Sequence, residues 1–337
     1  MTTLTRRGGT AVAALACAGM LLAGCSTGAT GEGTANGEVS TAQSEAVTIT
    51  ITNPLNLNTL PLYIGIEEGF FEEEGLTIEA GQTIGSGSTI EAVIGGQVDM
   101  AWTSVSGALL PFAQGIPLRL VAVSEIGTPG VLELLVKGDS LYQELADLQG
   151  KNVAVLSPAT GCMWQIKSAL EAEGLDPESI TLDIIAPREH PVVLDSGQVA
   201  AACTTDPLKT VMIEQFGARA IWDGEVDGVS ELQGLPSGGY FVSADYASNN
   251  PDAVAAFQRA IAKAAAWANE HEAEVRAMLP DLLEVDAALI DKVFIPRFSE
   301  ETGAAEYTGQ IETIADALYR TKLTDSLIGI EGFVEQD

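Results

Sequence analysis

The first regular pattern of hydrophobic and polar positions covers residues 46–52 (AVTITIT), where apolar β-branched residues alternate with threonine and predict a strand. Further on, Leu62, Ile66 and Phe70 recur at every fourth position, with glutamates on the opposite side, and Gly75 suits a helix end. This second pattern predicts an amphipathic helix. A strand followed by a helix with one apolar face is the unit from which α/β folds are built.

Predicted strands and helices then alternate along most of the chain. In the first part, strands are expected near 76–80, 98–102 and 118–124, with helices near 87–95 and 104–114. After a break at 128–130 (TPG) and a strand at 131–138, the alternation restarts with strands at 152–156, 180–185, 199–203 and 219–222 and helices at 161–173, 191–196 and 207–216. This order predicts parallel sheets in an α/β fold.

An internal repeat indicates two similar lobes. Residues 90–104 (IEAVIGGQVDMAWTS) align with residues 191–205 (PVVLDSGQVAAACTT), and the surrounding order of elements repeats as well. The chain is expected to cross between the lobes near 126–136 and to return near 235–243, so that the helices after Asn250-Pro251 pack on the first lobe. The expected domains are 46–127 with 240–337 for the first lobe and 128–239 for the second.

The amino terminus has the layout of a secretory signal. Arg6 and Arg7 precede an apolar run over 11–23 that is too short to span a bilayer. The run ends in Leu-Ala-Gly-Cys25, which resembles the lipobox of bacterial lipoproteins, where the peptide is cut before a cysteine that receives diacylglycerol. We expect residues 1–24 to be removed, Cys25 to be acylated and 25–45 to form a flexible tether. The alternative is an ordinary signal peptide with an incidental cysteine.

Charge and composition narrow the possible partners. The chain carries 47 acidic and 16 basic residues, so nucleic acid and anionic lipid surfaces are not expected partners, and membrane contact is expected only through the lipid anchor. An anionic ligand stays open, because exposed charges are screened over about 8 Å at physiological salt. Apart from Cys17 in the expected signal and the expected acylation site Cys25, the cysteines are Cys162 and Cys203. These two and the 2 histidines lack the spacing of a metal site, so neither a metal nor a cofactor is expected.

Ligands of open parallel sheets bind outside the carboxyl ends of the strands. In the first lobe this rule selects the loops 53–58, 85–89 and 103–104, and in the second lobe 157–164, 187–190 and 204–206. The candidate ligand-binding residues in or beside these loops are Asn53, Tyr63, Ser86, Gly87, Ser88, Thr103, Ser104, Thr160, Trp164, Arg188, Thr204, Thr205 and Asp206.

Most of these candidates offer neutral hydrogen-bond donors. Ser86 and Ser88 supply hydroxyls, and Gly87 lets a ligand approach the backbone, although the same residues also suit a simple turn with a helix cap. Thr103 and Ser104 at the next strand end favour a site.

Aromatic and charged candidates add specificity. Trp164, on the first turn of its helix, and Tyr63 are the preferred stacking residues over Trp102 and Tyr240, for which packing is the simpler role. Arg188 lies with His190 in a predicted cleft loop, and the alternative for it is a solvated turn. Asp206 is the one carboxylate among the candidate residues, so it would repel nitrate and accept hydrogen bonds from an amine or an amino-heterocycle.

Several segments resemble one family in order and spacing. They are PLYIGIEEGFFEEEGL (61–76), GGQVDMAWTS (95–104), LQGKNVAVLSPATG (148–161) and FVSADYASNNPDAVAAF (241–257). They are similar to the extracytoplasmic solute-binding proteins of ABC importers, in the SsuA/THI5-like branch that serves nitrate, sulfonates, taurine and thiamine-pyrimidine precursors. The resemblance implies a type II periplasmic-binding-protein fold of two doubly wound lobes joined by a two-crossing hinge. It also implies a monomer outside the cytoplasm that delivers its ligand to a permease with its ATPase.

Two departures from the family pattern fall where the ligand is expected. They are Thr205-Asp206-Pro207 and the Gly-Cys-Met-Trp run at 161–164, so the substrate is not carried over from the family. The expected ligand is a small polar organic molecule such as a sulfonate, a taurine-like or a pyrimidine-like compound. In this topology the copy alignment also places Cys162 and Cys203 at the ends of neighbouring strands, where a disulfide is expected.

Other functions remain as alternatives. An enzyme of the same fold, a lyase or a pyrimidine synthase, is one, because a fold does not fix a function. A nitrate or bicarbonate receptor is the second, and an adhesin or sensor is the third. The sequence contains no GxxxxGK[ST], HExxH or GxSxG motif, which favours binding without catalysis.

Overall fold

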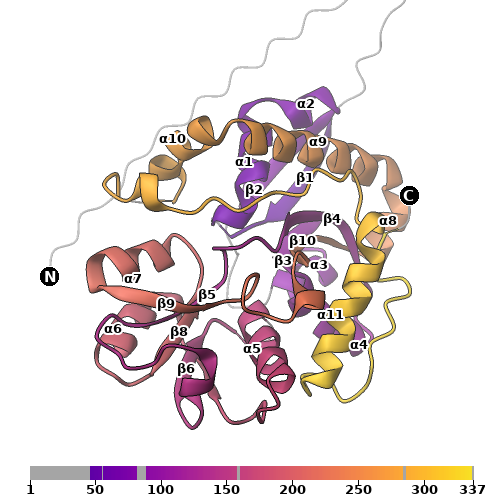
Figure 1. The fold of residues 1–337 in the computed structure, drawn as a ribbon. Coiled ribbons are helices and arrows are strands. Elements are labelled where there is room, and N and C mark those ends of the chain that lie inside the picture. The colour runs from indigo at the N-terminus through magenta and orange to yellow at the C-terminus, as the bar shows by residue number, and fades with distance from the viewer. Residues whose placement is uncertain (1–45, 55, 82–88, 158–159, 284–285, 336–337) are drawn as a thin grey trace, which may run out of the picture. The chain divides into compact units, whose positions relative to one another are not determined.

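Two five-stranded sheets are the framework of the protein (Figure 1). The first is built from two separate stretches of the chain, and the second from one continuous stretch, 133–223. The computed structural model describes residues 46–54, 56–81, 89–157, 160–283 and 286–335. The predictions for Cys25, Ser86, Gly87 and Ser88 lie outside the described residues.

The first sheet has the strand order β2-β1-β3-β10-β4. Its strands are β1 (Val47–Thr52), β2 (Leu76–Gly81), β3 (Met100–Ser104), β4 (Leu118–Ile126) and β10 (Pro236–Ser243). β1 is parallel to β2 and β3, whereas β10 is antiparallel to both β3 and β4. A strand from late in the chain therefore lies inside a sheet made by its beginning.

The second sheet repeats this arrangement with the order β7-β6-β8-β5-β9. Its strands are β5 (Glu133–Lys137), β6 (Asn152–Val155), β7 (Thr181–Ile184), β8 (Ala201–Thr204) and β9 (Ala218–Asp223). Here β5, which directly follows β4 of the first sheet, is the antiparallel strand. The chain therefore crosses between the sheets twice, over 127–132 and over 224–235. The return crossing lies earlier than the sequence predicted, because 236–243 already pairs as β10.

Helices cover both sheets. The helices attached to the first sheet are α1 (Leu60–Glu67), α2 (Phe70–Glu73), α3 (Thr89–Ile94), α4 (Val105–Ala113), α8 (Ala244–Asn249), α9 (Pro251–Glu270), α10 (Glu272–Leu283) and α11 (Thr308–Arg320). Those of the second sheet are α5 (Gly161–Ala172), α6 (His190–Asp195) and α7 (Leu208–Phe216). The single helix expected near 62–75 is split into α1 and α2, because Gly69 at φ 75° leaves the helical region.

The late helices pack on the first sheet, as the sequence predicted. On one face, the ring of Phe257 on α9 packs against the rings of Phe71 and Tyr240, with centroid distances of 5.5 Å and 5.1 Å. On the other face, Ile311 and Leu318 of α11 share a core with α4. Figure 1 shows α9 along the first sheet and α11 beside α4. Each fully buried large side chain of this kind stabilises the fold by about 1.5–3 kcal/mol.

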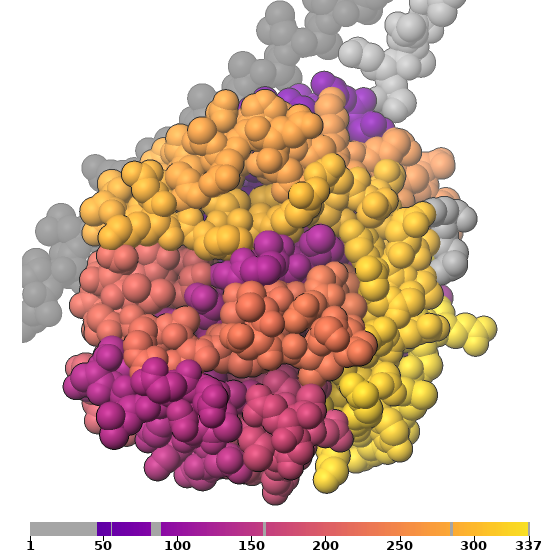
Figure 2. Space-filling model, viewed as in Figure 1, coloured from indigo at the N-terminus to yellow at the C-terminus, as the bar shows by residue number. Residues whose placement is uncertain are grey.

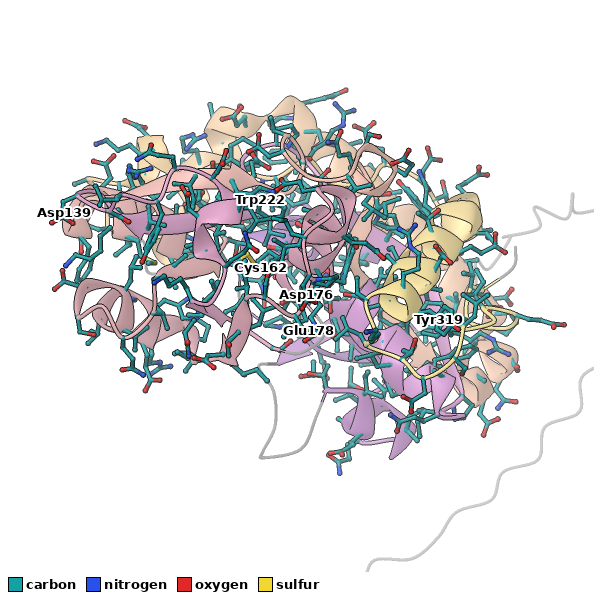
Figure 3. The ribbon with its side chains drawn as sticks, turned by 60° about the horizontal axis from the view of Figure 1, so that its bottom comes forward. Asp139, Cys162, Asp176, Glu178, Trp222 and Tyr319 are labelled. Carbon is teal, nitrogen blue, oxygen red and sulfur yellow. A yellow bond between two sulfur atoms is a disulfide. The ribbon has the colours of Figure 1, made fainter. Side chains whose placement is uncertain are left out.

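A disulfide joins Cys162 at the start of α5 to Cys203 of β8, with the Cα atoms 6.1 Å apart. Both residues are fully buried in the core of the second sheet, which also contains Trp222 of β9 (Figure 3). The bond ties the helix that follows β6 to the neighbouring strand.

Removal of this disulfide is expected to destabilise the protein. The bridged residues are 41 positions apart. Without the bond the unfolded chain gains conformational entropy, which lowers the free energy of unfolding by about 4 kcal/mol. In a chain of this size the loss corresponds to a fall in Tm of about 10 °C, which calorimetry of the Cys162→Ala/Cys203→Ala double variant measures. The same scan with reductant should lower the Tm of the unaltered protein and leave the double variant unchanged. Two titratable thiols in the denatured, unreduced protein would contradict the bond.

Candidate functional site

A cavity of about 310 Å³ lies at the two crossings between the sheets. It is lined by Asn56, Asn58, Trp102, Thr103, Ser104, Ser106, Glu125, Gly127, Val131, Leu132, Leu156, Thr160, Gly161, Trp164, Gln165, Thr205, Glu225, Leu235, Pro236, Ser237 and Ile314. The lining combines the carboxyl ends of strands from both sheets, where ligands of such sheets bind. In the space-filling view the crossing segments fill the middle of the visible face, between the parts that carry the two sheets (Figure 2).

Five predicted ligand-binding residues meet at this cavity: Thr103, Ser104, Thr160, Trp164 and Thr205. The Ser104 hydroxyl also caps α4, because it accepts the Gly107 N–H at 3.1 Å. Trp164 is almost fully buried, and its indole nitrogen has no hydrogen-bond partner. The rule of strand ends therefore selected residues from both lobes that line this cavity.

Other predicted residues lie away from the lining of the cavity. Asn53 is buried in the first sheet, and Tyr63 lies half-buried on α1. Thr204 is buried at the end of β8. Arg188 is exposed in the short 3-10 helix Pro187–Glu189, where water solvates its charge, so the sequence prediction of a cation in the cleft loop is not met.

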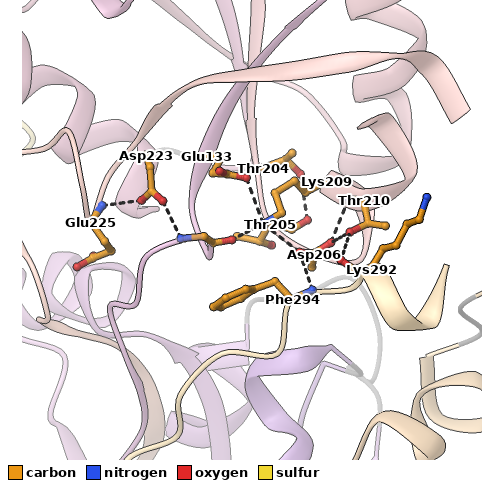
Figure 4. Close-up of polar contacts among 11 residues, drawn as sticks. Glu133, Thr204, Thr205, Asp206, Lys209, Thr210, Asp223, Glu225, Lys292 and Phe294 are labelled. Atoms are coloured by element: carbon orange, nitrogen blue, oxygen red, sulfur yellow. Dashed lines mark hydrogen bonds and ion pairs between the residues drawn. The ribbon is translucent and has the colours of Figure 1, made fainter. Parts of the chain in front are cut away.

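Asp206 does not present the free carboxylate that the sequence predicted (Figure 4). Its Oδ1 accepts the Thr210 N–H at 3.0 Å, and its Oδ2 accepts the Phe294 N–H at 3.2 Å. Lys209 Nζ lies 3.1 Å from Oδ2. Because these bonds occupy both oxygens, Asp206 is a structural anchor between α7 and the carboxy-terminal segment.

Lys209 is the centre of this buried network. Its Nζ lies 3.2 Å from Glu133, and it donates to the carbonyl of Gly130 in the first crossing. The N–H of Gly130 in turn donates to Asp223 Oδ2 at 2.6 Å (Figure 4). Gly130 thus bonds the first crossing to β9 through its N–H and to α7 through its C=O. A buried cation with two carboxylate partners is satisfied and is not available to a ligand.

Glu125, near the end of β4, is a cavity residue that the sequence analysis missed. It is 2% exposed, and its Oε1 accepts hydrogen bonds from Ser237 Oγ at 2.7 Å and from the Asn58 amide. Its Oε2 is buried without a partner. Burial raises the pKa of Glu125 to about 7, while the bonds from Ser237 and Asn58 act in the opposite direction.

Glu225, in the return crossing, is the second missed carboxylate. Its Oε2 accepts the Gly234 N–H at 2.6 Å, and the Gln165 side chain also bonds to it. Burial raises the pKa of Glu225, the Gly234 bond lowers it, and nearby Asp223 raises it. A side chain on Gly127 would collide with this carboxylate, so a glycine in the first crossing makes room for Glu225.

Two indole rings form the aromatic part of the lining. Trp102 Nε1 donates to Ser124 Oγ at 2.8 Å, and its ring lies where a side chain on Gly238 would otherwise be. Trp164, in contrast, has an unpaired N–H. One ring is therefore fixed within the first sheet, and the other offers a donor from the second lobe.

A sequence signal existed for Glu125 but not for Glu225. Glu125 is a charged residue near the carboxyl end of the apolar strand 118–126. The rule of strand ends that selected Thr103 and Ser104 therefore also applies to it. Glu225 lies in the crossing 224–235, which has no hydrophobic period. Its place in the cavity depends on contacts with Gly127 and Gln165 that are distant in sequence.

The described part of the chain restricts the chemistry of the site. Within it, no group of three or more His, Cys, Asp or Glu residues could hold a metal ion. The lining residues that it places around the cavity include no Lys, Arg, His or Cys. Searched over the same residues, no helix is long and apolar enough to cross a membrane.

Solved structures of low sequence identity share the fold. The periplasmic aliphatic sulphonate-binding protein SsuA from Escherichia coli superposes with a TM-score of 0.72 at 20% identity, over 86% of this chain and 92% of that one. The periplasmic nitrate-binding protein NrtA from Synechocystis PCC 6803 gives 0.66 at 16% identity, over 86% of both chains. The desulfurization enzyme DszB gives 0.61 at 17%, over 86% and 97%. The fold is therefore that of periplasmic binding proteins, and it also occurs in an enzyme.

Sequence comparison identifies the family. No curated protein matches the chain. The family model described as NMT1/THI5 like matches residues 56–275, which run from just before α1 to the first turn of α10 and include both crossings. The chain therefore belongs to the NMT1/THI5-like family.

Proposed function

We propose that the protein is the extracytoplasmic solute-binding lipoprotein of an ABC importer, which captures a small polar organic ligand between two lobes and delivers it to a permease. The observation that carries this proposal is the cavity at the crossings, which both sheets line. The double crossing supports a hinge, because two separately wound units joined by paired segments can rotate about them. Fold relatives that are sulphonate- and nitrate-binding proteins support the same class of function.

The proposed ligand-binding residues are those predicted residues that line the cavity, together with Glu125, Gln165 and Glu225. At about 310 Å³ the cavity is at the lower end of the size of small-molecule sites, which fits a small solute. Binding without catalysis is favoured because the described lining offers neither a Cys nor a Ser–His pair for nucleophilic attack.

The lipid anchor is a further part of the proposal, on the basis of the sequence Leu-Ala-Gly-Cys25. Cys25→Ala is expected to prevent acylation and to move the protein from the membrane fraction to the soluble one. Incorporation of labelled palmitate measures acylation, and Cys162→Ala serves as a control that should still incorporate the label. An unaltered protein that takes up no label would contradict the anchor.

Ligand binding should stabilise the protein and close the lobes. At a hundred times its Kd a ligand adds about 2.7 kcal/mol, which raises the Tm of a chain of this size by several degrees. The test is a thermal-shift panel of ethanesulfonate, taurine, an aminopyrimidine, nitrate, bicarbonate and organic cations, followed by small-angle scattering with each compound that binds. A smaller radius of gyration at saturation is expected.

Two matched tryptophan variants link binding to the cavity. Trp164→Phe removes the unpaired indole N–H and should weaken binding about fivefold or more, as expected for a lost hydrogen bond. Trp267→Phe is the control, because Trp267 of α9 stacks on His271, which follows that helix, and does not line the cavity. Equal affinity in both variants, or an unchanged radius of gyration, would contradict the proposed site.

A further inference from the structure

The polar atoms left without partners around the cavity are mostly acceptors. Three lining residues contribute a buried oxygen that has no hydrogen-bond partner: Asn56 Oδ1, Glu125 Oε2 and Gln165 Oε1. One lining residue contributes an unpaired donor, Trp164 Nε1. Buried polar atoms normally find a partner. The missing partner of this cavity must therefore bring more donors than acceptors.

The charge of the lining points in the same direction. Glu125 and Glu225 are the titratable residues that the described lining contains, and no basic residue accompanies them there. The buried cation described above, Lys209, is already held by Glu133, Asp206 and the Gly130 carbonyl. A bound anion would have to enter between two carboxylates that have no counter-charge in the cavity.

One feature of the lining favours an anion, and its charge is smaller than that of the two carboxylates. The helix α5 begins at the cavity with Gly161, and a helix amino terminus carries the equivalent of about half a positive charge. The corresponding end of α4 is already capped by Ser104. Half a charge on one side does not offset two carboxylates, even if each is only partly ionised.

We infer that the ligand is a small organic cation rich in N–H donors, such as an amidinium, a guanidinium or a protonated amine. Its N–H groups donate to Glu125 of the first sheet and to Glu225 of the return crossing. Its carbon frame lies against Trp102 and Trp164. This assignment rests on the proposed solute-binding function and names its ligand class. Because Glu125 belongs to the first sheet and Glu225 to the return crossing just after β9, a ligand that bonds to both links the first sheet to the crossing that leads from the second.

The binding of such a cation is expected to depend on pH. Glu225 shares the cavity with Glu125, and Asp223 is the charged neighbour of Glu225. Among the described residues packed against β4 near Glu125, Arg297 has a mostly exposed side chain and pairs with Glu300. With the pKa of Glu125 at about 7 in the empty cavity, the cation must displace a proton at acidic pH. Affinity therefore falls about 30-fold from pH 8 to pH 5.5.

The experiment compares three ring compounds of one shape on the full chain: benzamidine as the cation, benzamide as the neutral molecule and benzenesulfonate as the anion. Agmatine, with a guanidinium and an amine at its two ends, is the probe for both carboxylates. Titration calorimetry and thermal shift are read at pH 5.5, 7 and 8. We expect agmatine and benzamidine to bind more tightly than benzamide, and benzenesulfonate not to bind.

The variants are Glu125→Gln and Glu225→Gln, which keep the shape of each side chain and one of its two acceptor oxygens. Each should weaken agmatine by about tenfold to a hundredfold, and Glu125→Gln should also flatten the pH profile. The control is Glu74→Gln, which makes the same change in charge on the surface, where Glu74 pairs with Arg259. It should leave the affinity unchanged. Circular dichroism of each variant separates lost binding from lost folding.

The outcomes separate the ligand class from the proposed function. Tighter binding of benzenesulfonate or ethanesulfonate than of either cation, with compaction of the lobes, overturns the cation and leaves solute binding intact. Agmatine binding that neither glutamine variant weakens also overturns it. The cation is overturned as well if neither agmatine nor benzamidine binds at millimolar concentration. If no probe binds, charged or neutral, the result counts against solute binding itself.

Discussion

Strand β10 lies between β3 and β4, and this antiparallel pairing determines where the cavity forms. Gly238 pairs with Ser104 on one side and with Glu125 on the other. Side chains at Gly238 and Gly239 would collide with the Trp102 ring and with the backbone of Ala122. Two glycines are therefore required for β10 to enter the sheet. Once it does, Ser237 reaches Glu125, and the return crossing ends beside the first one.

The carboxy-terminal segment reinforces this arrangement from outside. Phe298 forms a β-bridge with Glu125, and the Ser299 N–H donates to the Ser124 carbonyl at 3.0 Å. A few residues earlier, the Phe294 N–H bonds to Asp206 of the second lobe. One segment thus contacts the strand that carries Glu125 and the network around Lys209. Breaking one member of such a buried ionic network typically costs about 3–5 kcal/mol, so the network holds the crossings in place.

The fold was predictable because its signals are local. Alternation, helical period and the repeat of 90–104 at 191–205 gave the order of strands and helices. Crossings and strand ends shifted by a few residues, and the helix expected near 62–75 is split at Gly69. The candidate site was predictable in part for the same reason. Thr103, Ser104, Thr160 and Thr205 lie at the carboxyl ends of strands or in the loops that follow them, so a rule about strand ends finds them.

The rest of the site depends on contacts between distant residues. Asp206 is unavailable because of Lys209, three residues on, and Phe294, which is 88 positions away. Glu125 acquires its environment from Asn58 and Ser237, which are 67 and 112 positions away. A sequence pattern cannot show which of two acidic residues has a counter-charge. The carboxylate that the sequence assigned to the ligand is neutralised by the protein, whereas two that it overlooked are not.

The most direct measurement is the identity of the molecule that the protein carries. Native mass spectrometry of protein isolated from the cells that make it, followed by denaturation and accurate-mass analysis of the released compound, gives its composition and charge. We expect a nitrogen-containing organic cation with several N–H groups, released more readily at pH 5.5 than at pH 8. A released sulfonate, nitrate or bicarbonate would contradict this expectation.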